Sequence, residues 1–83
     1  MQSTHPELLQ NVRDVIAKIL NVPLADVPAE MAFGDIPQWD SMGHMEVMLA
    51  LEENFSVPVN ADTIGELVSV PLIVEYISQN THA

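Results

Sequence analysis

The positions of the prolines constrain the fold of this 83-residue chain more than any other feature does. Proline lacks the backbone N–H and fixes φ, so helices tolerate it only in their first turn. The six prolines are Pro6, Pro23, Pro28, Pro37, Pro58 and Pro71. Pro23 must end any helix that starts near Pro6, and Pro58 must end any helix that starts after Pro37. Residues 22–40 hold three prolines and cannot form one regular helix.

Between these breaks, apolar residues recur at helical spacing, and no stretch alternates as a half-buried strand does. Thr4, Asn60 and Ser69 are suitable N-caps, and Pro6 and Pro71 fall in permitted first turns. We therefore predict an all-α chain with one domain over 1–83. Its helices are expected at about 5–20, 41–55, 61–67 and 70–79, with a loop over 21–40.

The predicted loop is unusually long, because loops above about 12–15 residues in a compact domain are usually functional or disordered. It contains apolar side chains that could anchor it to the helices, namely Val27, Met31, Phe33, Ile36 and Trp39. We interpret the loop as ordered, with a short helical turn at about 24–27.

The composition excludes several classes of protein. Lys and Arg together number two, and Asp and Glu together number twelve, so the net charge is -10. This charge argues against binding nucleic acid or an anionic membrane. A hydrophobic fraction of 48% is too high for a disordered acidic tail. The absence of Cys excludes disulfides and thiolate chemistry, and a cytoplasmic location is the default expectation. We also expect neither a secretory signal nor a bilayer-spanning segment, and a monomer.

Ser41, where the long loop meets the second helix, has two interpretations that the sequence leaves open. Its hydroxyl could be the N-cap of that helix, or an exposed attachment point. A catalytic nucleophile is less plausible, because the flanks lack the Gly-x-Ser-x-Gly pattern and a serine alcohol needs an oriented base. If Ser41 is modified, another enzyme must supply the chemistry. A phosphodiester there would lie beside the free N–H groups of the helix start.

The segment Asp40-Ser41-Met42, followed by the helical residues 45–55, resembles the Asp-Ser-Leu motif and second helix of acyl carrier proteins. The resemblance extends over nearly the whole chain. It implies a small four-helix bundle, with three longer helices and one short one, that catalyses nothing. It also implies that a phosphopantetheinyl transferase attaches 4'-phosphopantetheine from coenzyme A to Ser41. The thiol of this arm would carry acyl groups as thioesters.

The resemblance further implies which residues meet partner enzymes, here the transferase and the synthases or ligases that load and transfer acyl groups. These residues are Met42, Glu46, Leu49, Glu52 and Glu53. Asp40 is also expected at this interface, because its charge opposes a phosphodiester on Ser41 and better serves a cation or metal ion held by a partner. A helical wheel places Glu46 and Glu53 on the outer face but Glu52 nearer the core. The alternative interpretation is a merely solvated acidic face.

The chain also departs from the usual pattern of the family. Gly43 replaces a common acidic residue and costs up to about 1 kcal/mol relative to Ala within a helix. The run from Trp39 to His44 is not typical of the housekeeping fatty-acid carrier and more closely resembles small stand-alone carriers of specialised biosynthesis, such as polyketide assembly. We predict that Trp39 packs the loop end and that His44 is a packed or capping residue.

The methionines are predicted to belong to the core and to be able to yield to a stored acyl chain. They are Met31, Met45 and Met48. Any cavity for such a chain is expected among the second helix, the third helix and the long loop.

Other functions remain as alternatives. An aminoacyl or peptidyl carrier would share the same arm, whereas a non-covalent helical interaction domain would lack it. The acidity also suggests a binder of divalent ions, but the chain lacks the Asp-x-Asp-x-Asp-Gly spacing of a calcium loop, so no dedicated metal site is expected.

Overall fold

A computed structural model describes residues 5–80 of the chain, which contain four α-helices, one 3-10 turn and no strand. The helices are α1 (Pro6–Leu20), α2 (Ser41–Phe55), α3 (Ala61–Glu66) and α4 (Val70–Asn80), and the 3-10 turn is η1 (Leu24–Asp26). This confirms the all-α fold class with one short helix. Thr4, the expected N-cap of the first helix, lies outside the described residues.

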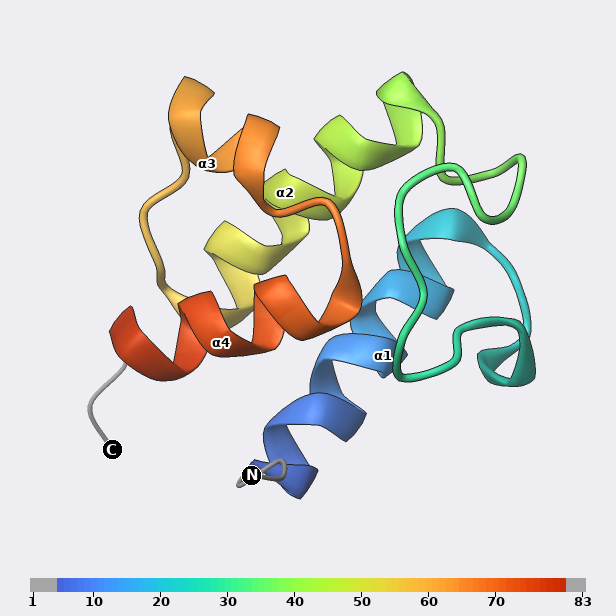
Figure 1. The fold of residues 1–83 in the computed structure, drawn as a ribbon, viewed down its shortest axis with the longest axis horizontal. Helices are drawn as coiled ribbons and strands as arrows, with labels where there is room; N and C mark the ends of the chain where they lie inside the picture. Colours follow the sequence, from blue (N-terminus) through green and yellow to red (C-terminus); the bar gives the residue numbers. More distant parts are fainter. Residues whose placement is uncertain (1–4, 81–83) are drawn as a thin grey trace.

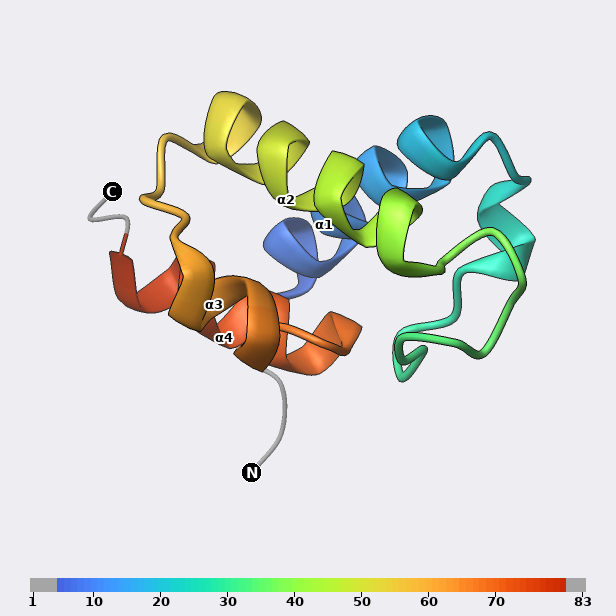
Figure 2. The same ribbon diagram turned by 90° about the horizontal axis from the view of Figure 1, so that it is seen from above.

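The helices pack around one shared core (Figures 1 and 2). α1 contacts both α2 and α4, while the short α3 contacts α2. Each long helix contributes apolar side chains three or four residues apart, as a single buried stripe requires. These fully buried residues are Val12 and Ile16 from α1, Val47, Met48 and Leu51 from α2, and Val70, Ile73 and Ile77 from α4.

Local sequence explains where most of the helices begin and end. α1 has Pro6 in its first turn and ends at Asn21, which adopts the left-handed conformation that often closes a helix. Asn60 and Thr63 form a reciprocal capping box at the start of α3. The Ser69 hydroxyl accepts a hydrogen bond from the Leu72 N–H, as expected for the cap of α4.

The long connection between α1 and α2, residues 21–40, is ordered as predicted and wraps one end of the molecule (Figures 1 and 2). Val27, Met31 and Trp39 are fully or almost fully buried within the core. Main-chain hydrogen bonds tie this loop to the start of α4, because Phe33 donates to the Val68 carbonyl and Val70 donates to the Met31 carbonyl, both at 2.8 Å. The loop is therefore fixed to the start of α4.

Arg13 on α1 anchors the same loop from the other side. Its Nε donates to the Val27 carbonyl at 2.6 Å, and its second terminal nitrogen lies 3.5 Å from the Leu24 carbonyl. A hydrogen bond to a charged group contributes about 1.5–3 kcal/mol. We expect Arg13→Ala to lower the free energy of unfolding by about that amount, as measured by urea titration.

The matched control for this variant is Lys18→Ala, which removes the same charge from an exposed position in the last turn of α1. Only a helix-dipole interaction of about 0.3–1 kcal/mol is lost there. Hydrogen exchange in residues 22–31 should quicken in Arg13→Ala alone. Equal losses of stability in the two variants would show that charge, and not the anchoring of the loop, is responsible.

Candidate functional site

Ser41 is the first residue of α2, and its side chain is exposed. The loop delivers it to the edge of the molecule, where α2 begins (Figure 1). Among the described residues, its hydroxyl has no hydrogen-bond partner. The oxygen is therefore open to an incoming enzyme, as an attachment point requires.

The N-cap of α2 is Asp40, not Ser41, so the capping interpretation of Ser41 is wrong. The Asp40 carboxylate accepts a hydrogen bond from the Gly43 N–H at 2.9 Å, and its backbone is extended as in an N-cap residue. Both residue types cap helices well, and only the backbone conformation decides between adjacent candidates. Because Asp40 takes this role, the Ser41 hydroxyl is not used to hold the helix.

Gly43 stands where the loop closely approaches α2. A Cβ atom built on it would overlap the carbonyl oxygen of Gln38 and lie 2.9 Å from Leu20 Cδ2. An acidic side chain therefore has no room at this position. The sequence identified Gly43 only as a lost charge and a helix-weakening residue, but close packing is what requires it.

Beneath this turn, Trp39, His44 and Ile64 form a chain of hydrogen bonds, which we call the polar bridge; it is buried at Trp39 and His44 and half-buried at Ile64. The Trp39 indole N–H donates to His44 Nδ1 at 3.0 Å, and His44 Nε2 lies 2.8 Å from the Ile64 carbonyl oxygen. Trp39 is fully buried and His44 is 5% exposed. The prediction that both side chains are packed is confirmed.

The partners of His44 determine where its proton lies. The indole nitrogen can only donate, so Nδ1 must accept, and the Ile64 carbonyl can only accept, so Nε2 must carry the hydrogen. The Phe33 ring meets the His44 ring edge-on, with centroids 5.4 Å apart, and contacts Trp39 in the same manner at 6.5 Å. The bridge thus connects the loop, α2 and α3.

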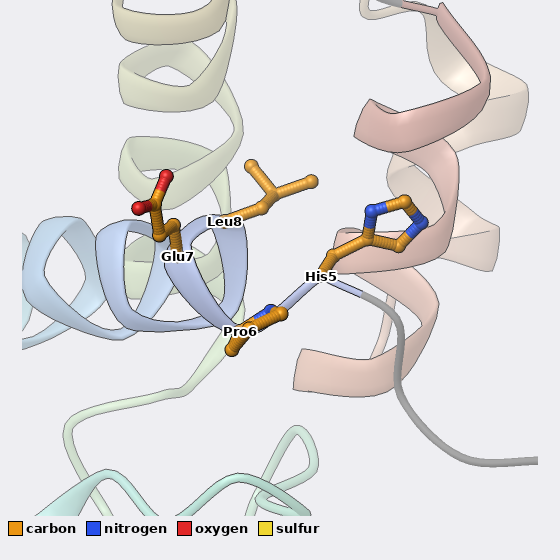
Figure 3. A pocket seen from close by; sticks show the side chains of 4 residues that line it. All are labelled: His5, Pro6, Glu7 and Leu8. Atoms are coloured by element: carbon orange, nitrogen blue, oxygen red, sulfur yellow. The ribbon is translucent and has the colours of Figure 1, made fainter.

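A hollow of about 340 Å³ lies elsewhere, at the first turn of α1 (Figure 3). His5, Pro6, Glu7 and Leu8 line it. These four consecutive residues lie at the end of α1 that is remote from the loop and from Ser41 (Figure 1). The hollow is therefore not part of the Ser41 region.

The chain resembles known proteins over most of its length. The chain matches the family model described as the phosphopantetheine attachment site over residues 10–77. It is 32% identical over 81 residues to the acyl carrier protein of Acidothermus cellulolyticus, covering 98% of this chain and 96% of that relative. The chain belongs to the acyl carrier protein family.

Further acyl carrier proteins support this membership. That of Helicobacter pylori strain G27 is 36% identical over 73 residues, covering 88% of this chain and 94% of the relative. That of Thermobifida fusca is 29% identical over 79 residues, covering 95% of this chain and all of the relative. An acyl carrier protein is a carrier and not a catalyst, and its prosthetic group is covalently attached 4'-phosphopantetheine.

The start of α2 fits the phosphate of such a group. In an α-helix the first four N–H groups lack intrahelical acceptors, and they attract anions to the positive end of the helix. Asp40 occupies the Gly43 N–H. The N–H groups of Ser41 and Met42 remain in the first turn, directly beside the exposed hydroxyl. The Asp40 carboxylate opposes a phosphate there, but it is held toward Gly43.

The outer face of α2 combines acidic and apolar side chains. The residues expected to meet partners are all exposed, and they are Asp40, Met42, Glu46, Leu49, Glu52 and Glu53. Met42 is 73% and Leu49 57% exposed, which is unusual for large apolar residues. α2 carries three Glu and no Lys or Arg. This surface, which we call the acidic face, would suit a basic partner with an apolar depression.

Two expectations about α2 were wrong. Met45 was predicted to belong to the core, but it is 45% exposed and extends the apolar part of the acidic face. Glu52 was placed nearer the core, yet it is exposed like Glu53. Met31 and Met48 are buried, as predicted. A helical wheel gives relative directions only, and the positions of α1 and α3 decide which of them face solvent.

Two further properties of the described residues bear on function. No helix within residues 5–80 is long and apolar enough to cross a membrane. No group of three or more His, Asp or Glu side chains in that part of the chain is arranged to hold a metal ion.

Proposed function

We propose that Ser41 carries the phosphopantetheine arm and that this protein presents acyl groups to biosynthetic enzymes as thioesters of the arm's thiol. The observation that supports this proposal is the exposed Ser41 hydroxyl at the start of α2. This hydroxyl does not cap the helix, because Asp40 does so. The N–H groups beside it favour the phosphate that would join the arm to the protein.

In this proposal the chain supplies only the acceptor oxygen. A phosphopantetheinyl transferase supplies the base, because no His within residues 5–80 is hydrogen-bonded to the Ser41 hydroxyl and His44 is held in the polar bridge. The Ser41 oxygen forms a bond to the phosphorus of the pantetheine phosphate. The bond from that phosphorus to the nucleotide part of coenzyme A breaks, and the hydroxyl proton passes to the base.

Intact-mass measurement tests the proposed function directly. After incubation with coenzyme A and a transferase of broad specificity, we expect the whole protein to gain the mass of one phosphopantetheine. An unchanged mass, under conditions in which the same transferase modifies another carrier, would instead favour a non-covalent interaction domain that lacks the arm.

We also propose that the acidic face is where partner enzymes dock. With a net charge of -10, the protein attracts a basic partner, and surface carboxylates act mainly on the rate of encounter. Each exposed charge pair contributes only about 0–1 kcal/mol, so the complexes would be weak and short-lived. Such docking suits a protein that must visit several enzymes.

Reversing one charge on the acidic face should slow the docking of the transferase. We expect Glu46→Lys to lower kcat/KM for loading about three- to tenfold at low salt, and less at physiological salt, where charges are screened over about 8 Å. Glu75→Lys makes the same change at an exposed position on α4 and should leave kcat/KM nearly unchanged. If the two variants lowered kcat/KM equally, the change in net charge alone would explain the slower loading.

The pathway is a finer proposal. The run from Trp39 to His44 favours a carrier of specialised biosynthesis, such as polyketide assembly, acting in the cytoplasm as a monomer. An aminoacyl or peptidyl carrier would use the same arm and the same helix. The intact mass of the protein purified from its native host distinguishes these cases, because it reports the cargo on the arm. A long unbranched alkyl group would speak against the specialised role.

A further inference from the structure

The interior beside Ser41 bears on which cargo this protein carries. The sequence suggested a cavity among α2, α3 and the long loop, with methionines that could yield. An acyl chain on an arm at Ser41 would reach it by a route between α2 and α3, which are in contact. In the structure the polar bridge spans it, because His44 on α2 bonds both to Trp39 at the loop end and to Ile64 on α3.

The bridge sits close to the start of that route. His44 follows Ser41 by three residues, so the two lie within one turn of the same helix. The serine side chain is exposed while the imidazole is buried. Phe33 packs edge-on against both rings of the bridge and adds a third aromatic side chain at the loop.

Opening this route would leave the polar groups of the bridge without partners, and of its three residues Trp39 and His44 are buried and Ile64 is half-buried. Separation of α3 from α2 orphans the His44 Nε2–H and the Ile64 carbonyl, and displacement of the ring also orphans the Trp39 N–H. The free energy lost with each broken hydrogen bond cancels the free energy gained by burying about one to four methylene groups. The loss of two hydrogen bonds therefore cancels the gain from burying roughly three to eight carbons. Making space in the packed core would cost further free energy.

We infer that the polar bridge closes the space between α2 and α3 to the cargo, so the acyl chain stays on the outside of the protein. The favoured cargo is then a short or polar acyl group, such as one bearing hydroxyl or keto oxygens, because a long alkyl chain would remain exposed to water. This inference rests on the proposed attachment of the arm at Ser41.

The test compares thermal unfolding of the protein bearing acetyl- and octanoyl-phosphopantetheine, loaded from the corresponding acyl-coenzyme A. Intact mass first confirms loading, so failed loading counts against the proposed function and not against the bridge. In the wild type we expect the same Tm and the same Trp39 emission for both forms. A higher Tm for the octanoyl form, with a shift in the emission of this single buried tryptophan, would overturn the inference.

Removing the polar bridge should let the acyl chain enter between α2 and α3. In His44→Ala, which lacks both hydrogen bonds and leaves space, the octanoyl form is expected to melt several degrees above the acetyl form. Trp39→Phe removes the indole donor and part of the ring volume but keeps the bond between His44 and the Ile64 carbonyl, and it serves if His44→Ala does not fold. Its octanoyl form should also melt above its acetyl form, by a smaller margin. Equal melting of the two forms in a folded variant would show that the bridge is not what excludes the chain.

Discussion

Ser41→Ala is expected to abolish loading with phosphopantetheine completely while leaving the fold intact. The hydroxyl is exposed and caps nothing, because the Asp40 carboxylate holds the Gly43 N–H. Alanine is also the best helix former and suits the first turn of α2. We therefore expect the free energy of unfolding to change by no more than about 0.5 kcal/mol. Intact mass after incubation with transferase and coenzyme A measures the loss.

Ser78→Ala is the matched control for this prediction. It removes a serine hydroxyl from α4 that donates only to the Glu75 carbonyl within the same helix. This variant should load fully. Residual loading of Ser41→Ala would mean that another hydroxyl accepts the arm, and a large loss of stability would mean that Ser41 supports the helix start after all.

The second large effect is expected at Gly43. In an exposed helix interior, Gly→Ala usually stabilises a protein by up to about 1 kcal/mol. Here the added methyl group would overlap the Gln38 carbonyl oxygen and press on Leu20. Overpacking of this kind costs typically 1–3 kcal/mol, and the obstacle is a main-chain atom that cannot rotate away. We expect Gly43→Ala to lower the free energy of unfolding by about 2–3 kcal/mol.

Gly65→Ala makes the same change where the structure leaves room. Gly65 lies in α3, and nothing lies within 4 Å of the position of its added Cβ atom. We expect this variant to be stabilised by up to about 1 kcal/mol, so the two substitutions should shift Tm in opposite directions. At about 4–8 °C per kcal/mol for a domain of this size, calorimetry resolves both shifts. A Tm shift of the same sign in both would contradict the close approach at Gly43.

Much of the fold follows from local signals in the sequence. Pro23 and Pro58 mark where helices must stop, and Asn60 and Ser69 mark where α3 and α4 start. These signals act between residues a few positions apart, so they can be read without knowledge of the fold. The outer position of Glu46 and Glu53 also followed from helical periodicity alone.

What the sequence did not reveal depends on contacts between distant segments. The Ile64 carbonyl that bonds to His44 is a main-chain group twenty residues away. Every residue has such a carbonyl, so the amino-acid sequence does not indicate which one binds His44. Gly43 is required by the Gln38 carbonyl, which only the folded loop brings close. Met45 was wrongly predicted to be in the core, because the side of α2 that faces solvent depends on how α2 packs against its neighbours.

The cap at Asp40 has a consequence for how partners could tell one state of the protein from another. Since the helix start is closed by a neighbouring residue, grafting a group onto Ser41 would require no rearrangement of the polypeptide. The unmodified and modified forms would then present the same docking surface. An enzyme that must act on only one of them would have to sense the attached group itself, and the unmodified form would compete for the same enzymes.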